Sequence, residues 1–211
     1  YRKWMAETDN LLKAQFSGMF QSGNFPTVPL SQGLDLEIHT LGSLKGEYET
    51  IKYIDISCID NTLQRVTSYT EYPIDGAPSR AQQVLKKGDI LVSTVRPNLR
   101  NIAVNPYEEG NVIGSTGLCV LRCRTWLPEY VWGVVTSDGF TRSLCRAASG
   151  ISYPAVRDGD ILRYPVPDAP RGLQRAFADL VRHCETSKEE MERAISELKA
   201  LSGKIVAEHL G

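Results

Sequence analysis

The part of the chain that most constrains the fold is residues 171–210, RGLQRAFADLVRHCETSKEEMERAISELKALSGKIVAEHL. It contains no proline, and no glycine falls between Gly172 and Gly203. Two sets of residues recur every seven positions, the second set four residues after the first, which is typical of a coiled-coil seam. The first set is Phe177, Cys184, Met191, Leu198 and Ile205, and the second is Val181, Lys188, Ile195, Ser202 and His209. We therefore predict one continuous helix with an apolar stripe.

The length of this helix indicates how it is used. Its 40 residues would run about 60 Å. A small domain cannot cover such a stripe over its whole length, so we expect the N-terminal helix to cover part of it and another chain or repeat the rest. The polar seam residues Lys188 and Ser202 are expected to weaken packing and to fix register. The alternative is an amphipathic helix folded back on its own domain.

Three zones divide the chain: a short N-terminal helix in 1–26, a mixed domain in 27–168 and the long helix in 169–211. The first helix is expected over 1–20 and ends before Gly23, Asn24 and Pro26. The apolar residues expected on one of its faces are Trp4, Leu11, Leu12, Phe16, Met19 and Phe20. The predicted fold class is α+β, with many short strands in the central zone.

Short apolar runs in the central zone are rich in Val, Ile, Thr and Tyr and are bounded by turn residues, as strands are. We predict strands at Ile51–Ile59, Ile90–Val95, Ile102–Val104, Val112–Cys123 and Ile161–Val166. The pattern becomes helical between Pro128 and Ala148, with a break expected at Ser137-Asp138-Gly139.

Composition narrows the class of protein. The 211 residues carry a net charge of −1 and are 42% hydrophobic, which is ordinary for a globular protein. No apolar run reaches the length of a membrane span, and no apolar segment follows the N-terminus as in a secretory signal. Five cysteines without a Cys-x-x-Cys pair are expected to be reduced thiols in a cytoplasmic protein. The chain begins with Tyr1 rather than Met, which favours a piece of a longer chain.

Enzyme motifs are mostly missing from the sequence. There is no phosphate-binding loop, no dinucleotide-binding glycine pattern and no nucleophile elbow, and the three histidines are scattered. We expect no catalytic residue, no metal site and no cofactor in this chain. One loose match to metal-dependent nucleases joins Asp168 to Glu197 and Lys199. A helix through Leu198 would carry Glu197 some 40 Å from Asp168, so we disfavour this alternative.

Polar loops of the central zone are better candidates for function. Nine arginines but only two lysines lie between residues 80 and 163. Arginine matches phosphate and guanine in a planar, bidentate way. The most distinctive loop is 93–101, STVRPNLRN, and the others are 114–117, GSTG, and 149–154, SGISYP, followed by Arg157. These could also be ordinary loops with surface ion pairs, because the zone has 14 basic against 16 acidic residues.

At these residues the chain resembles the specificity subunit of type I restriction–modification enzymes. Four stretches carry the resemblance: LLKAQFSGMF at 11–20; APSRA at 77–81 with KGDILVSTVRPNLRN at 87–101; GSTG at 114–117; and YPAVR at 153–157, leading through Val166-Pro167 to QRAFA at 174–178 and the long helix. The resemblance implies a target recognition domain flanked by spacer helices. In that family, two such domains held apart by an antiparallel coiled coil each read half of a bipartite DNA sequence.

The resemblance also implies partners. The subunit would have no catalysis of its own and would dock methyltransferase subunits and, through them, a restriction and translocation subunit. S-adenosylmethionine, ATP and Mg would belong to those partners. Only one recognition domain is present, so a second one is expected in a longer chain or in a second copy of this chain. The leading alternative is a protein–protein adaptor that works through its heptad helix.

The DNA contacts can be assigned in two groups. A motif shared by proteins that read different sequences should contact the phosphate backbone, whereas base readers should lie in less family-like loops. The backbone group is Arg80, Arg96, Asn98 and Arg100. Further DNA-binding candidates, not assigned to either group, are Ser93, Thr94, Asn101, Ser115, Thr116, Ser152 and Arg157. The candidate base readers are Lys45, Tyr48 and Arg65, in the segments 41–50 and 60–75. A structural turn that pins the sheet is the alternative reading of loop 93–101.

Overall fold

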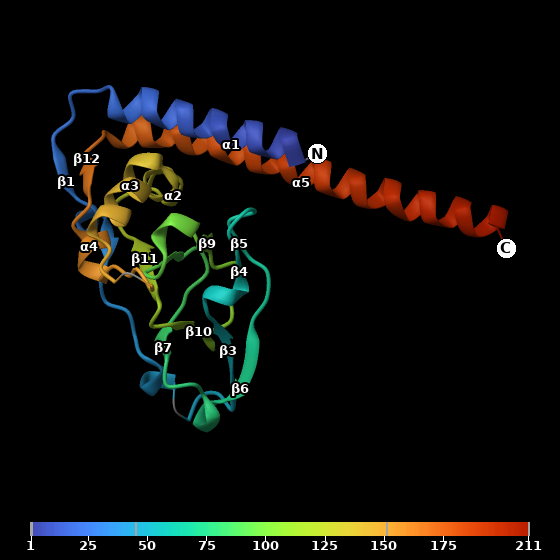
Figure 1. Ribbon diagram of the computed structural model, residues 1–211, viewed down its shortest axis with the longest axis horizontal. Helices are drawn as coiled ribbons and strands as arrows, with labels where there is room; N and C mark the ends of the chain where they lie inside the picture. Colours follow the sequence, from blue (N-terminus) through green and yellow to red (C-terminus); the bar gives the residue numbers. More distant parts are fainter. Residues whose placement is uncertain (1, 45, 151, 211) are drawn as a thin grey trace.

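The computed structural model describes the backbone of residues 2–44, 46–150 and 152–210, and the side chains of Trp4, 7–44, 46–150 and 152–202. A mixed domain of sheets and short helices carries one very long helix, which continues well past the domain (Figure 1). A shorter helix from the N-terminus runs alongside the first part of it (Figure 1). The predicted α+β class, with a short N-terminal and a long C-terminal helix, is confirmed.

The α-helices fall where the sequence patterns are strongest, with one exception described below. Ser137 ends the first helix of the predicted pair and begins the second, because its hydroxyl accepts a hydrogen bond from the Phe140 amide at 3.2 Å. The helices are α1 (Arg2–Phe16), extended by a π-helical turn (Ser17–Gln21), α2 (Pro128–Thr136), α3 (Asp138–Ala147), α4 (Asp158–Leu162) and α5 (Arg171–Leu210).

The strands form three sheets in the described part of the chain. The six-stranded sheet has the order β2-β11-β8-β9-β5-β4, and the four-stranded sheet has the order β6-β3-β10-β7. The strands are β1 (Thr27–Pro29), β2 (Leu34–Asp35), β3 (Thr50–Ile54), β4 (Ile59–Asp60), β5 (Arg65–Val66), β6 (Thr70–Pro73), β7 (Ala81–Val84), β8 (Ile90–Ser93), β9 (Ile102–Val104), β10 (Val112–Ser115), β11 (Leu118–Cys123) and β12 (Pro165–Pro167). The pairs β5–β9 and β3–β10 are parallel.

The third sheet, made of β1 and β12, is called the base sheet here. β1 pairs with β12 in antiparallel register, Val28 opposite Val166. This pair joins the segment that follows α1 to the segment that precedes α5, so α1 ends and α5 begins at the same end of the domain (Figure 1). The small sheet therefore sets α1 and α5 side by side.

An aromatic cluster, made of Phe16, Phe20, Tyr130 and Phe177, holds the two long helices to the domain. The rings of Phe16 and Phe20 lie 5.4 and 5.6 Å from the ring of Phe177, and Phe20 lies 4.7 Å from Tyr130. The Tyr130 hydroxyl donates a hydrogen bond to the Pro167 carbonyl beside the base sheet. Three segments distant in sequence, α1, α2 and α5, therefore share one core. Leu11, expected on the apolar face of α1, is instead exposed.

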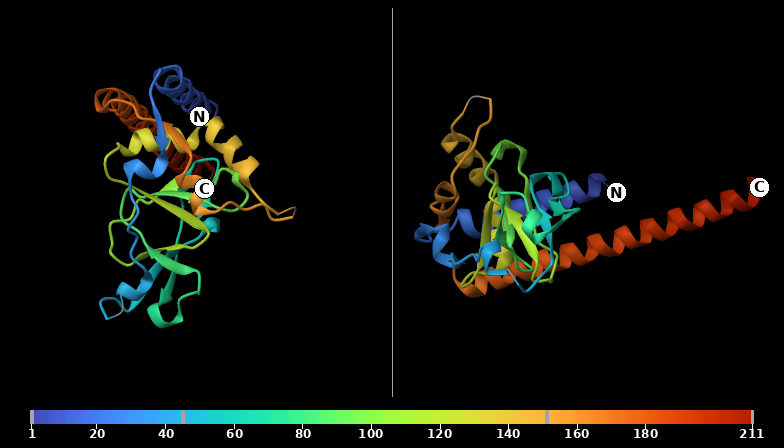
Figure 2. Two further views of the ribbon diagram at one scale, coloured as in Figure 1. Left: turned by 90° about the vertical axis from the view of Figure 1, so that its left-hand side faces the viewer. Right: turned by 90° about the horizontal axis from the view of Figure 1, so that it is seen from below.

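The seam of α5 has two different surroundings. Its proximal half, Arg171–Lys188, is covered by α1 and α2, and Phe177 and Val181 are buried there. Its distal half, residues 189–202, runs past the end of α1 and away from the body of the domain (Figure 2), and it touches the domain through the ion pair between Glu192 and Arg65 of β5. Met191 and Leu198 are 42% and 65% exposed there. The helix does not fold back on its domain, so that alternative is wrong for the described residues; the side chains of Ile205 and His209 lie outside them.

Three predicted strands are wrong in part. Val112–Cys123 is divided at Thr116-Gly117 into β10 and β11, which belong to different sheets. Ile51–Ile59 is broken after Ile54, because the Asp55 carboxylate accepts a hydrogen bond from the Ser57 amide at 2.8 Å and starts a 3₁₀ turn. Ile161–Val166 begins as the last part of α4 rather than as a strand. Its Asp-Gly-Asp turn is a helix start, because the Asp160 carboxylate accepts from the Arg157 amide at 2.9 Å.

The five thiols are all free, as the sequence indicates. Burial raises the pKa of Cys119 strongly and that of Cys123 to about 12, so both thiols stay neutral at pH 7 and are poor nucleophiles. Across the helices whose residues are described, none combines the length and apolar character needed to cross a membrane.

Candidate nucleic-acid interface

Loop 93–101 leaves β8, makes a 3₁₀ turn at Pro97–Leu99 and enters β9. Arg96 and Arg100, on either side of that turn, have φ angles of 48° and 52°. This left-handed region is uncommon for residues other than glycine and costs of order 1 kcal/mol or more for each residue. The Arg96 amide is fixed by a 2.8 Å hydrogen bond to the Pro154 carbonyl. The surrounding loops thus hold the turn in a conformation that it would not keep alone.

Three polar loops that are distant in sequence meet at this turn. The Thr94 hydroxyl and amide both donate to the Gly117 carbonyl, at 3.1 and 3.0 Å. The Thr94 carbonyl accepts from the Val156 amide at 2.8 Å. Loops 93–101, 114–117 and 149–157 are therefore bonded into one unit, although the sequence gives only their separate positions.

A fourth segment joins the same unit. The Thr116 amide donates to the Arg80 carbonyl at 2.9 Å, which brings the APSRA stretch beside the GSTG loop. The connection between α3 and α4, which carries Tyr153, projects from the side of the domain (Figure 2). All four stretches that carry polar loop motifs therefore lie together.

Seven exposed side chains on these loops make up what we call the three-loop surface. They are Arg80, Arg96, Asn98, Thr116, Ser152, Tyr153 and Arg157. The Arg96 guanidinium lies 4.9 Å from the centre of the Tyr153 ring, and Tyr153 is 59% exposed. A cation over an aromatic face is oriented without being neutralised, so Arg96 keeps its full charge for a ligand. Planar arginine, hydroxyl and amide groups of this kind suit phosphate and base edges.

Tyr153 is absent from the site residues expected from the sequence. The signal available was an aromatic residue before proline inside a polar loop, which a surface turn also explains. Its partner Arg96 is 57 positions earlier in the chain, so only the folded structure brings the two together.

Three of the predicted DNA contacts are instead engaged inside the loops. Ser93, Thr94 and Ser115 are buried. The Ser93 hydroxyl donates to the Val95 carbonyl at 2.8 Å, and the Ser115 hydroxyl accepts from the Gly117 amide at 3.2 Å. These hydroxyls shape the loops, which supports the structural interpretation of this part of the motif. Asn101 is half-buried and its carbonyl accepts from the Ser93 amide at 2.9 Å.

Other predicted contacts are held by ion pairs within the chain. Arg100 donates to Asp138 at 2.6 Å, and this hydrogen bond lowers the pKa of that carboxyl. Arg65 binds two glutamates of α5, Glu185 and Glu192, rather than facing solvent freely. Tyr48 is exposed at 37% on a separate loop, and Lys45 lies outside the described residues.

The nuclease-like carboxylates do not converge. Asp168 lies beside the base sheet, where its amide bonds Pro26, and Glu197 is in the distal half of α5, about 39 Å farther along the helix from Arg171. The residues that the structure describes contain no cluster of three or more His, Cys, Asp or Glu side chains able to hold a metal ion.

The chain is similar to two solved structures of known proteins. No protein-family model and no curated protein matched. Among solved structures, the HsdS subunit from Thermoanaerobacter tengcongensis is 32% identical, with a TM-score of 0.65 over 83% of this chain and 46% of that protein. A second, from work on complex assembly and conformational transition of the type I R-M system, is 32% identical, with a TM-score of 0.66 over 84% and 47%.

This chain spans about half the length of both solved proteins. The matched region takes in most of the chain, more than the central domain alone could supply. The resemblance inferred from the loop motifs and the heptad helix is thereby confirmed: this chain has the fold of one half of a type I restriction–modification specificity subunit.

Proposed function

We propose that this chain binds double-stranded DNA and reads one half of a bipartite target for a type I restriction–modification complex. The observation that carries the proposal is the joining of four family-like loop stretches into one exposed surface with three arginines. The surface is also preorganised. Hydrogen bonds join the loops to one another, and the backbone of Arg96 and Arg100 is held in the left-handed conformation before any ligand binds.

The charge balance of the domain does not argue against DNA binding. Several acidic residues of the domain are already paired with basic side chains away from the three-loop surface. Asp89 is buried and binds Arg122 through two hydrogen bonds, at 3.0 and 2.7 Å, and Glu109 binds Lys52. A near-neutral domain can therefore still present one basic face.

The proposed partners follow from the family and from the distal half of α5. Its exposed seam residues Met191 and Leu198, with exposed Leu201 three residues after Leu198, require a covering helix from a second recognition half, in a longer chain or in a second copy. Two copies related by a twofold axis would favour a palindromic bipartite target. Methyltransferase and restriction subunits would supply catalysis, together with S-adenosylmethionine, ATP and Mg, so the role of this chain is recognition without catalysis.

The decisive test is DNA binding at several salt concentrations. Phosphate contacts release counterions, so the affinity should fall steeply as salt rises, whereas an adaptor that docks a peptide would show little such dependence. Arg96→Ala should weaken binding by about 1–3 kcal/mol, because a charge-assisted contact is lost. Alanine keeps the Cβ atom, so the backbone strain at this position changes little.

Arg163→Ala is the matched control for this experiment. Arg163 is also exposed but pairs with Asp160 one helical turn away in α4, outside the three-loop surface. Its loss should leave DNA affinity unchanged. Equal affinity for wild type and Arg96→Ala would assign loop 93–101 to structure. Unchanged adenine methylation motifs in a host with and without the gene would argue against the whole proposal.

A further inference from the structure

A charged network ties the hairpin β4–β5 to both long helices. Arg65 on β5 approaches Glu192 at 3.1 Å and Glu185 at 3.7 Å, and both glutamates are on α5. Glu185 also accepts from Lys188 at 2.7 Å, and Lys188 donates to Asp9 of α1 at 2.7 Å. We call Arg65, Glu185 and Glu192 the brace, because they join the recognition domain to α5 far from its main attachment.

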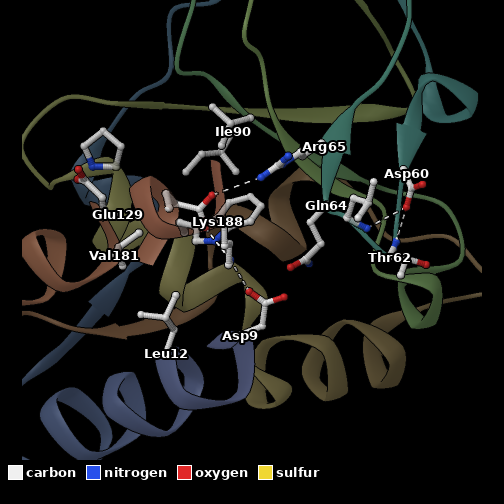
Figure 3. A pocket seen from close by; sticks show the side chains of 15 residues that line it. Asp9, Leu12, Asp60, Thr62, Gln64, Arg65, Ile90, Glu129, Val181 and Lys188 are labelled. Atoms are coloured by element: carbon white, nitrogen blue, oxygen red, sulfur yellow. Dashed lines mark hydrogen bonds and ion pairs between the residues drawn. The ribbon is translucent and has the colours of Figure 1, made fainter. Parts of the chain in front are cut away.

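Open space surrounds the brace. A cavity of about 630 Å³ lies between the hairpin, α1, α2 and α5. Figure 3 shows Lys188 between Arg65 and Asp9, with these two approaching from opposite sides of the cavity. Apolar packing does not fill this region, so charged side chains that cross the gap hold the hairpin to the helix there.

The aromatic cluster and the brace attach α5 to the domain at two separate points, and together they can set the angle between α5 and the domain. Phe177 in the aromatic cluster and Glu192 in the brace are 15 residues apart, which is about 22 Å of helix. One attachment alone would leave a pivot, whereas two separated attachments fix a direction. A shift of about 2 Å at Glu192 would grow to about 3 Å at residue 202, close to the 3.4 Å rise of one base pair.

The hairpin also contacts the proposed DNA surface. The Asn61 amide group in its turn donates to the Leu99 carbonyl of loop 93–101 at 3.0 Å. The Asp60 carboxylate accepts from the Thr62 and Leu63 amides, both at 2.8 Å, and shapes that turn. A bonded path therefore runs from α5 through Arg65 and the hairpin to the loop that carries Arg96.

We propose that Arg65 is a positioning residue: the brace sets the angle between the recognition domain and α5, and so the number of base pairs allowed between the two half-sites. The last step rests on the proposed function, whereas the angle itself does not. The role of Arg65 is then to hold the domain in place through α5, which replaces the base-reading role predicted from the sequence.

Spin-label distances within one chain test the angle without DNA. The labels are placed on Cys145, the exposed thiol of α3, and on Lys199→Cys in the distal half of α5, with Cys123 and Cys184 replaced by alanine. The labelled chain is diluted with unlabelled chain. Wild type should give a narrow distance distribution, and Arg65→Ala a broader or shifted one with an unchanged circular dichroism spectrum.

Two controls separate the brace from a general loss of order. Arg65→Glu should broaden the distribution, and Arg65→Glu combined with Glu192→Arg should narrow it again, because the pair is restored with its charges exchanged. High salt should also broaden the distance distribution of wild type. The ion pairs of the brace are partly exposed, so salt screens their attraction. Arg182→Ala, which removes a pair with Glu129 near the aromatic cluster, should leave the distribution narrow.

The functional arm uses the assembled complex and targets whose half-sites are one base pair closer or farther apart. Arg65→Ala should reduce the preference for the native spacing several-fold, while affinity for an isolated half-site stays unchanged. Unchanged label distances in Arg65→Ala would overturn the brace. A wild-type complex that binds no DNA would overturn the proposed function, and the label distances would still decide the angle.

Discussion

The proximal and distal halves of α5 share one heptad pattern but have opposite surroundings. Phe177 is 1% exposed within the aromatic cluster, whereas Leu198, three heptads later, is 65% exposed. The difference follows from length: α1 and its π-helical turn cover about 30 Å, and α5 runs about 60 Å. A heptad therefore reports that a helix has an apolar face, and the length of the neighbouring elements decides whether its own chain covers that face.

The role of the proximal half as the attachment point is tested most directly at Phe177. Phe177→Ala should lower the free energy of unfolding by about 3–5 kcal/mol, because it leaves a cavity beside the rings of Phe16 and Phe20. Urea denaturation followed by circular dichroism measures the change. Leu198→Ala is the matched control in the distal half, and its free energy of unfolding should stay within about 0.5 kcal/mol of the wild-type value. A loss below about 1 kcal/mol at Phe177 would mean that the proximal half is not the attachment point.

The opposite experiment places a charge in the distal half. Leu198→Glu should leave the unfolding of the isolated domain unchanged but weaken pairing with a second recognition half about 10- to 100-fold, or about 1.4–2.7 kcal/mol. Sedimentation equilibrium of wild type and variant measures this, alone and with partner subunits. Ser196→Glu, off the seam on the same turn, should pair as wild type does. Equal assembly of Leu198→Glu and wild type would show that the distal seam is not an interface.

Sequence signals that are local and periodic predict the structure correctly. The heptads predict α5, and Ser137 predicts the break between α2 and α3, because each depends on neighbours within a few residues. Asp158-Gly159-Asp160 misleads, since the same letters make a turn before a strand or, through the Asp160 cap, a helix start. A one-turn helix gives too few residues for periodicity to decide.

The candidate site shows the same division between local and distant information. The STVRPNLRN motif locates the loop, but the motif cannot tell that Arg96 faces solvent over Tyr153 while Arg100 binds Asp138. Arg65 looks like a base reader in isolation because its partners Glu185 and Glu192 are over a hundred residues away in the chain. Tertiary folding brings acidic residues that are distant in sequence next to some arginines and not to others. The sequence alone does not show which arginines form such ion pairs and which remain open to a ligand.

The boundary between the two halves of α5 falls at Lys188, which gives the smallest expected effect. Lys188 is 4% exposed but bonds Asp9 and Glu185, whose side chains reach solvent. Lys188→Met should change the free energy of unfolding at pH 7 by less than about 1 kcal/mol, because a methionine fills the seam while both carboxylates can be hydrated. A loss above about 3 kcal/mol would instead show that this network is a main source of stability.

The pH dependence of the stability of the same variant tests whether Lys188 is held as a cation. Burial alone would lower the pKa of Lys188, but the hydrogen bonds to Asp9 and Glu185 outweigh it and raise the pKa. A lysine whose pKa is higher in the folded state stabilises that state below its unfolded value, about 10.4, and the contribution disappears as the pH rises through the folded value. The free energy of unfolding of wild type minus that of Lys188→Met should therefore be constant between pH 6 and 9. This difference should fall only above about pH 10.4. Chemical denaturation at a series of pH values measures that difference, and a fall already at pH 8 would mean that Lys188 is not held as a cation by its two carboxylates.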